Sequence, residues 1–500
     1  MVIRSRLFAF LAFGAVAGFT VARSHALRAA SSEGPTVIEA AINLKDAGSS
    51  IARSFLGLSI EYGPTVSNMV SSGHGHRRSL EGMLNEWGRF NGPPVLRIGG
   101  NSEDMAAWNL PALRHPRPGV TIDITPQFCR DMRRLCRKTG VKLILGLNLG
   151  RGTPAMARRW VREALMRIGA KHILAFEIGN EPDAYVLTHQ RKPGYTLTDY
   201  EKNFATVANA IAPLLPRPGM IAGPAFSCFW LKQQTAVFIR QMHRYLGLVT
   251  IHDYPLGIRR AIPMRTSIRY DSIAHLLDHR SSYIYYSILS KTVAAARQFH
   301  LPVRWGEMNS AAGGGDPGIS DSFASVLWLT NALFYAAQGG AVGVNLHDAG
   351  SALCPYAIFR YNRKDHLVPH PDYDAMLLFA MASCHGARLL SAITLRRRHV
   401  KVWATRNRNG TIRLVIVNSR MHRGVRLQVP ARGYGLTDVV SVSAPSVVSF
   451  EMPTWQNIRP SNASLAGNPR ASSLARTSRG ELGVSMPQAS IYMLTLKRRD

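Results

Sequence analysis

Eight short apolar runs recur between residues 55 and 348, and longer amphipathic segments separate them. The runs are FLGLSIEYG, PPVLRIGG, VKLILGLNL, ILAFEIGNE, GMIAGPAF, LGLVTIHDY, PVRWGEMN and AVGVNLHD. Such runs indicate strands buried on both faces, and the clearest helix between them begins after Thr153, with Pro154 at its first position. Eight alternating strands and helices predict a (β/α)8 TIM barrel. The alternative, an open doubly wound sheet, would carry a GK[ST] loop, or a GxGxxG turn after an early strand. The sequence has no GK[ST], and its one GxGxxG match, GGGDPG at 313–318, follows only the seventh run.

The pattern changes near Ala387, where the runs become shorter and alternate between apolar and polar residues. Examples are HVKVWATRNRNGTIRLVIVN, with a hairpin signal at Asn409 and Gly410, and then GVRLQV, VVSVSAPSVVSF and SIYMLTL. These runs predict a C-terminal β-sandwich over 387–500, following a barrel over 51–386. We expect a long surface loop at 460–480. The segment 27–50 includes TVIEAAINL, a loosely alternating candidate strand of the same sandwich.

The first 26 residues read as a secretory signal peptide. Arg4 and Arg6 precede an apolar stretch, and Ser24 and Ala26 have the spacing of a signal-peptidase site. The alternative, an N-terminal anchor helix, is disfavoured because the stretch is shorter than the ~20 residues that span a bilayer. The sequence therefore predicts a secreted or periplasmic protein without a membrane span after cleavage.

The formal net charge of +31 favours acidic partners, such as an acidic polysaccharide. The basic residues are spread over many short segments without an aromatic-interleaved motif, so we expect no nucleic-acid partner. The alternative to an acidic partner is that the positive charge belongs to an ordinary basic, solvated surface. Five scattered cysteines do not indicate a disulfide scaffold, and the sequence does not fix an oligomeric state.

Polar residues follow the predicted strands, and the C-terminal ends of barrel strands converge on one face. Two of them are Glu181, the last residue of the fourth run, and Glu307, in the seventh. Such a pair suits glycoside cleavage, in which a carboxyl of raised pKa donates a proton and a second carboxylate of low pKa attacks or activates water. Pro182 predicts an extended backbone at Glu181. The alternative for each glutamate is a surface ion pair at a strand end.

Metal binding is the alternative role for carboxylates and histidines that gather at the rim of a barrel. The sequence has no HExxH and no paired His or Cys spacing. His252 and Asp253 are adjacent, so they point to opposite faces of a strand. We therefore expect no metal and no cofactor.

The motifs FLGLSIEYG, VLRIGGNSEDMAAWN, FEIGNEPDAY and WGEMNSAAGGGDPGISDSF together resemble family 79 of the glycoside hydrolases, which contains β-glucuronidases and heparanases. The resemblance covers roughly residues 50–385. It implies a retaining mechanism with Glu181 as acid/base and Glu307 as nucleophile. It also implies substrate-binding roles for Asn180 at the sugar 2-hydroxyl, Asp104 at other hydroxyls, Tyr254 beside the nucleophile, and Gly313, Gly314 and Tyr356 at the glucuronate carboxylate.

The function expected from these observations is that of a secreted retaining exo-β-glucuronidase acting on glucuronic-acid-containing glycans or glucuronides. One alternative is a heparanase-like endo-β-glucuronidase acting on an acidic polysaccharide. Another, from a different class, is a noncatalytic polyanion-binding protein on a glycosidase scaffold. The presence of both glutamates argues against the last one.

Overall fold

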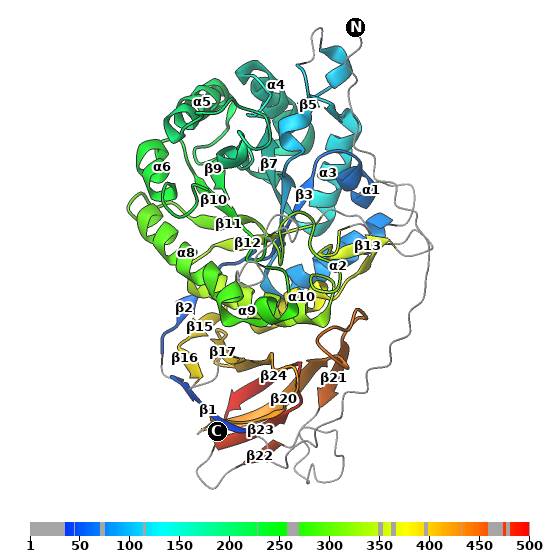
Figure 1. Ribbon diagram of the computed structural model, residues 1–500, viewed down its shortest axis with the longest axis vertical. Coiled ribbons are helices and arrows are strands. Elements are labelled where there is room, and N and C mark those ends of the chain that lie inside the picture. The colour runs from blue at the N-terminus through cyan, green and yellow to red at the C-terminus, as the bar shows by residue number, and fades with distance from the viewer. Residues whose placement is uncertain are drawn as a thin grey trace, which may run out of the picture. The chain divides into compact units, whose positions relative to one another are not determined.

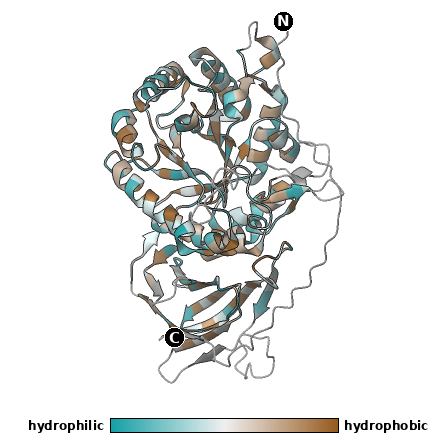
Figure 2. Ribbon diagram, viewed as in Figure 1, coloured by the Kyte–Doolittle hydropathy of each residue, from teal (hydrophilic) through white to brown (hydrophobic). Residues whose placement is uncertain are grey.

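Eight parallel strands form a closed barrel in the computed structural model of the chain (Figure 1). Around the barrel they are β3 (Gly57–Glu61), β4 (Val95–Gly99), β7 (Lys142–Leu147), β8 (Ile173–Ile178), β9 (Ile221–Phe226), β10 (Leu248–Asp253), β11 (Val303–Met308) and β12 (Gly343–His347). Each of the eight apolar runs supplies one strand, so the predicted TIM barrel is confirmed. Hydrophobic residues recur along these strands, as Figure 2 shows.

The structure describes residues 36–44, 46–70, 76–113, 117–227, 229–257, 270–348, 354–361, 367–394, 399–431, 433–458, 474–476 and 481–499. The predicted signal peptide at 1–26 lies outside these residues. In the described part of the chain, no helix combines the length and the apolar character needed to cross a membrane.

The helices lie mostly between consecutive barrel strands. They are α1 (Pro64–Val70), α2 (His76–Asn91), α3 (Pro126–Thr139), α4 (Pro154–Ala164), α5 (Leu197–Ile211), α6 (Thr235–Met242), α7 (Ile273–Leu277), α8 (His279–Arg297), α9 (Phe323–Gln338) and α10 (Asp372–Ala382). Helix α4 begins as expected: the Thr153 side chain accepts a hydrogen bond from the N–H of Met156 over 3.2 Å, and Pro154 occupies the first turn. Two short sheets accompany the barrel, β5 (Ala106–Trp108) with β6 (Ile122–Ile124), and β13 (Phe359–Tyr361) with β14 (Leu367–Pro369).

The remaining strands form two sheets that share one hydrophobic core, which is the predicted β-sandwich. The first sheet has the order β2 (Ser49–Ser50), β15 (Arg388–Leu390), β17 (Val400–Arg406), β18 (Ile412–Asn418), β24 (Ser490–Arg498), β20 (Tyr434–Ser443) and β21 (Thr454–Ile458). The second has the order β16 (Ala392–Thr394), β1 (Thr36–Ile42), β19 (Val425–Pro430), β23 (Glu481–Met486) and β22 (Leu474–Arg476).

The N-terminal strand β1 lies in the second of these sheets. It pairs in parallel with β19, with Ile38 opposite Leu427, and antiparallel with β16. The hairpin signal at Asn409 and Gly410 does join β17 to β18, and Gly410 has a φ of 81°. The surface loop expected at 460–480 is wrong in part, because Leu474–Arg476 pair with β23 as strand β22. The rest of that segment lies outside the described residues, and the domain boundaries stay predictions.

The sandwich packs against helix α9 of the barrel. Nε1 of Trp403 on β17 donates to Oδ1 of Asn331 over 2.9 Å, and its ring stacks on Phe334 at a centroid distance of 5.3 Å. The first two N–H groups of α9 donate to the carbonyl oxygens of Ser449 and Val447. A hydrophobic cluster runs without interruption from the barrel through these contacts into the sandwich.

Candidate active site

Glu181 lies three residues beyond the end of β8, in a turn. Its backbone has φ 46° and ψ 55°, which is the left-handed region, so the extended conformation expected from Pro182 is wrong. The N–H of Glu181 donates to the carbonyl oxygen of Ala225 on the neighbouring strand β9 over 3.2 Å. This bond between strand ends outweighs the local preference set by the proline. Strained backbone of this kind, at a residue other than glycine, is concentrated at functional sites.

Glu307 lies on β11 and is only 7% exposed. The hydroxyl of Tyr254 donates to its Oε1 over 2.6 Å, and Nη1 of Arg97 donates to its Oε2 over 2.7 Å. The hydroxyl of Ser59 lies 3.5 Å from the same Oε2. Both oxygens therefore have donors, which fix the carboxylate and favour its charged form.

The two glutamates face one another across a narrow gap. Glu181, His252 and Glu307 each bring one side-chain atom to within 4.8 Å of the others. Nδ1 of His252 lies 3.2 Å from Oε1 of Glu181. Gly306 leaves room for this histidine, because a Cβ there would lie 3.1 Å from Nε2. The barrel thus brings together two carboxylates that are 126 residues apart in sequence, from Glu181 to Glu307.

The pKa values of the two carboxyls are shifted in opposite directions. Burial raises the pKa of Glu181, the charge of Glu307 raises it further, and the hydrogen bond with His252 offsets part of the shift. Burial would also raise the pKa of Glu307. There the electrostatic effects of His347, His252 and Arg97 and the hydrogen bond from Tyr254 outweigh burial, and the pKa falls to about 2.

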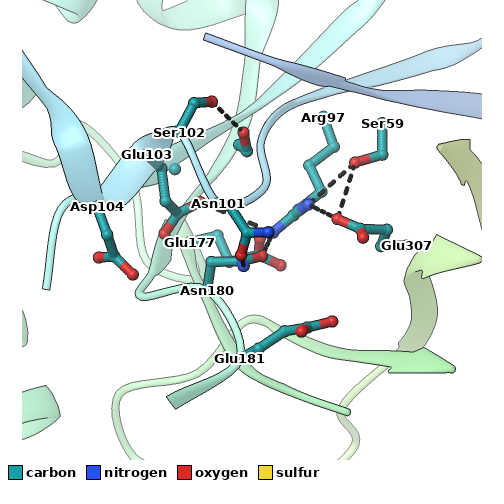
Figure 3. A network of polar contacts seen from close by, with 12 residues as sticks. Ser59, Arg97, Asn101, Ser102, Glu103, Asp104, Glu177, Asn180, Glu181 and Glu307 are labelled. Carbon is teal, nitrogen blue, oxygen red and sulfur yellow. Dashed lines mark hydrogen bonds and ion pairs between the residues drawn. The ribbon is translucent and has the colours of Figure 1, made fainter. Parts of the chain in front are cut away.

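Arg97 of β4 is the centre of a buried ion-pair network (Figure 3). Its Nε atom pairs with Glu177, Nη1 with Glu307, and Nη2 lies 3.7 Å from Glu103. Nη2 also donates to Oδ1 of Asn180 over 2.9 Å. Burial would lower the pKa of Arg97, but the charges of the three carboxylates outweigh it and raise the pKa above its usual range. The network therefore positions Glu307 and Asn180 from one guanidinium.

Asn180 and Tyr254 lie where a sugar bound between the two glutamates could be contacted. Asn180 directly precedes Glu181, is 4% exposed and donates from Nδ2 to Oδ1 of Asn101 over 3.3 Å. The Tyr254 hydroxyl reaches Glu307 from the end of β10. Both residues belong to the same constellation as the two carboxylates.

Asp104 is fully buried and braces the segment that follows β7. Its Oδ1 accepts hydrogen bonds from the N–H groups of Leu149 and Gly150 over 3.0 and 2.7 Å, and from the Tyr185 hydroxyl over 3.2 Å. Its Oδ2 is buried and has no hydrogen-bond partner in the described part of the chain. Burial raises the pKa of Asp104 to about 6. A sugar hydroxyl would have to reach Oδ2, since Oδ1 is already engaged.

Of the predicted carboxylate-binding residues, Tyr356 lies against Tyr254, the tyrosine that contacts Glu307, and Gly314 contacts Tyr356. The rings of Tyr254 and Tyr356 stack at a centroid distance of 6.2 Å, and the N–H of Tyr356 donates to the carbonyl oxygen of Gly314 over 3.5 Å. Gly313 and Gly314 have φ values of 72° and 101°, which side chains rarely adopt. A chain of contacts thus connects Glu307, through the two tyrosines, to the glycine turn.

The cluster of Glu181, His252 and Glu307 is also the one place among the described residues where three potential metal ligands meet. Its donor set does not fit a cation well. The Glu307 oxygens already accept from Tyr254 and Arg97, and the guanidinium charge at 2.7 Å would repel a metal ion.

The sequence interpretation did not include Arg97, Glu177, Glu103 or Ser59 among the functional residues. A signal for the first two was present, because a charged residue inside a strand buried on both faces must have a buried partner. The runs VLRIGG and ILAFEIG each contain one such residue, of opposite charge. Glu103 and Ser59 carry no comparable signal.

Comparison with known proteins supports the resemblance seen in the motifs. No protein-family model matches the chain, so the family number stays a prediction. A β-glucuronidase of Neurospora crassa is 25% identical over 310 residues, which cover 53% of this chain and 52% of that protein. A β-glucuronidase of Aspergillus niger is 24% identical over 294 residues, with coverages of 52% and 51%. The chain spans about half the length of the curated relatives it matches.

Solved structures match over nearly the whole chain. A 4-O-α-L-rhamnosyl-β-D-glucuronidase from Fusarium oxysporum has a TM-score of 0.72 at 18% identity, covering 92% of this chain and all of that one. A family 51 arabinofuranosidase from Xanthomonas axonopodis pv. citri has a TM-score of 0.66 at 14% identity, with coverages of 92% and 99%. These identities show the fold alone. The chain thus has the barrel-and-sandwich fold of glycoside hydrolases, and its sequence is similar to that of β-glucuronidases.

Proposed function

We propose that this protein is a retaining exo-β-glucuronidase that removes terminal β-linked glucuronic acid from glycans or glucuronides. The observation that carries the proposal is the pair Glu181 and Glu307, whose carboxylates approach within 4.8 Å and whose pKa values shift in opposite directions. Retaining glycosidases hold their two carboxyls ~5–5.5 Å apart, and inverting ones ~6.5–9.5 Å apart. The similarity to two β-glucuronidases supports the choice of sugar.

In the first step, Glu307 attacks the anomeric carbon while the protonated Glu181 donates its proton to the leaving oxygen. The low pKa of Glu307 keeps this carboxylate ionised, and the raised pKa of Glu181 keeps a fraction of it protonated. The bond from Tyr254 orients the attacking carboxylate. The product is a covalent glucuronyl-enzyme and a free aglycone.

In the second step, water replaces Glu307 at the anomeric carbon. Once Glu181 has lost its proton it acts as the base that deprotonates this water. His252, at 3.2 Å from Glu181, orients the carboxylate for both proton transfers. Two inversions at one carbon give net retention of configuration.

Glucuronate differs from glucose in its carboxylate, so the site needs a group that recognises it. We assign this role to the N–H groups of Gly313 and Gly314 and to the hydroxyl of Tyr356. Successive main-chain N–H groups in a glycine turn form an anion-binding concavity. Support comes from the contacts that join this turn, through Tyr356 and Tyr254, to Glu307. Secretion remains part of the proposal and rests on the leader sequence.

The proposal is tested with three substrates. The protein should hydrolyse an aryl β-glucuronide and leave the matching aryl β-glucoside nearly untouched. Proton NMR of the early reaction should show the β-anomer of glucuronic acid as first product. A glucuronate-terminated oligosaccharide should lose one terminal sugar at a time. Release of the α-anomer first would contradict retention, and release of internal fragments would favour the endo-acting alternative.

A further inference from the structure

A cleft of about 770 Å³ lies far from the catalytic glutamates, where the barrel meets the sandwich. Its walls come from the segment before β3, the end of α2, the link between α10 and β15, and the turn between β17 and β18. The first two segments precede β3 and β4, so they lie at the N-terminal ends of the parallel barrel strands. Glu181 and Glu307 lie at the opposite ends, so this cleft is not part of the candidate active site.

The cleft is strongly basic. Arg53, Arg89, Arg388, Arg408 and His385 line it, and none of the described residues that line it is Asp or Glu. Among the described residues, no ion pair joins Arg53 or Arg408 to a carboxylate, and Arg388 donates to the carbonyl oxygens of Ala47 and Gly48. Arg89 forms an ion pair with Glu86 at 3.6 Å. Concentrated positive charge with few carboxylate partners favours an anionic ligand.

The side chains of Arg53 and Arg408 lie close to two glycines of the cleft wall. Arg53 lies over Gly92, whose added Cβ would meet its Cγ at 2.7 Å, and Arg408 lies against Gly386, whose added Cβ would meet its Nε at 3.3 Å. The Asn91 side chain links parts of the wall, because its Oδ1 accepts a hydrogen bond from the N–H of Phe55 and its Nδ2 donates to the carbonyl oxygen of Ser383. The two exposed arginines thus lie directly on the wall of the cleft.

A second feature of the cleft is a hydrogen-bond acceptor without a donor. Asn407 lines it, is 6% exposed, and its Oδ1 is buried with no hydrogen-bond partner in the described part of the chain. A bare oxyanion cannot donate a hydrogen bond to this oxygen, whereas a sugar hydroxyl can. Carboxylate or sulfate groups together with hydroxyls are the chemistry of an acidic oligosaccharide. The volume is within the range of sites for ligands of that size.

We propose that this cleft is a noncatalytic docking site for an acidic oligosaccharide segment, separate from the site of hydrolysis. The docking proposal rests on the proposed function in one respect, namely that the protein meets glucuronate-containing glycans. The role of the docking site would be to keep the enzyme on a polymeric substrate while chain ends enter the barrel. Because Arg53, Arg388 and Arg408 are exposed, binding should weaken as salt screens the charges.

The test measures binding by calorimetry in Glu307→Gln, which blocks turnover. A hyaluronan hexasaccharide should bind at two sites per chain, and adding Arg53→Ala with Arg408→Ala should remove one of them or weaken it roughly tenfold or more. The matched control is Arg130→Ala with Arg134→Ala, which removes the same charge from α3 and should leave both sites intact. Neutral cellohexaose and sodium sulfate should bind the second site at least roughly tenfold more weakly than the hexasaccharide.

Hydrolysis of a small aryl glucuronide by the Arg53→Ala/Arg408→Ala protein, with Glu307 present, should equal that of the unsubstituted chain. Equal hexasaccharide binding in the two double variants would overturn the docking site, and sulfate binding as tight as that of the hexasaccharide would overturn its glycan character. A chain that hydrolyses no glucuronide but still loses a binding site on Arg53/Arg408 substitution would refute the proposed function and leave the docking site standing.

Discussion

Nη1 of Arg97 donates a hydrogen bond to Oε2 of Glu307 over 2.7 Å, in a place where neither the guanidinium nor most of the carboxylate meets solvent. The same guanidinium also pairs with Glu177. A buried charge of this kind has two effects that can be measured separately. It holds Glu307 ionised and in place, and it offsets the charge of carboxylates that would otherwise be buried without a partner.

Arg97→Ala should lower the free energy of unfolding by about 3–5 kcal/mol, because the substitution leaves Glu177 and Glu103 buried without a cation. Adding Glu177→Gln to it should recover part of this loss. Urea unfolding at pH 7 measures both effects, and Arg130→Ala on the exposed face of α3 should change stability by less than about 0.5 kcal/mol. An Arg97→Ala protein as stable as the control would show that the network does not stabilise the fold.

Tyr254→Phe should reduce kcat by roughly 10- to 100-fold, because it removes a hydrogen bond to a charged group worth about 1.5–3 kcal/mol. Since that bond lowers the pKa of Glu307, the acidic limb of the pH–rate profile should move upward by about one to two pH units. Tyr283→Phe, at an exposed tyrosine of α8, is the control and should change neither quantity. Loss of activity without movement of the limb would argue against this role for Tyr254.

The pH dependence of kcat/KM should be bell-shaped with an acidic optimum. In the proposed mechanism Glu307 must be ionised, so activity should be lost as the pH falls towards its pKa of about 2. Glu181 must be protonated, so activity is lost as the pH rises through its raised pKa. In Glu181→Gln, an aryl glucuronide with a good leaving group should show no alkaline limb. An unchanged alkaline limb in that variant would assign it to another group.

The barrel, and the meeting of Glu181 and Glu307 at one rim, could be predicted from sequence because both rest on local patterns. Eight apolar runs mark the strands, and the residues that follow a parallel barrel strand must meet at one rim. The backbone of Glu181 could not be predicted, since its bond to Ala225 depends on the neighbouring strand end. Strand β22 could not be predicted either, because it forms through pairing with β23. The apolar pattern of residues 474–476 is too short to indicate a strand.

The pairing of β1 with β19 predicts that the N-terminal strand stabilises the sandwich. Ile38 is 2% exposed and lies in the sandwich core, so Ile38→Ala should cost about 2–5 kcal/mol in the free energy of unfolding. Hydrogen exchange should become faster in β19 and β23, whereas amides of barrel strands β7 and β8 should be affected less. Glu39→Ala, on the exposed face of the same strand, is the control. Unchanged exchange in β19 would show that β1 adds little to the sheet.

The central claim is that Glu307 is the nucleophile and Glu181 the acid/base, and mutant chemistry with azide tests it most directly. Glu307→Ala should abolish turnover of an aryl glucuronide. Glu181→Ala should still form the glucuronyl-enzyme when the leaving group needs no proton, but should hydrolyse it slowly for want of a base. Azide needs no base, so it should restore turnover of Glu181→Ala and give β-glucuronyl azide, with retained configuration. Rescue of Glu307→Ala with retained product, or full activity in either variant without azide, would contradict the account.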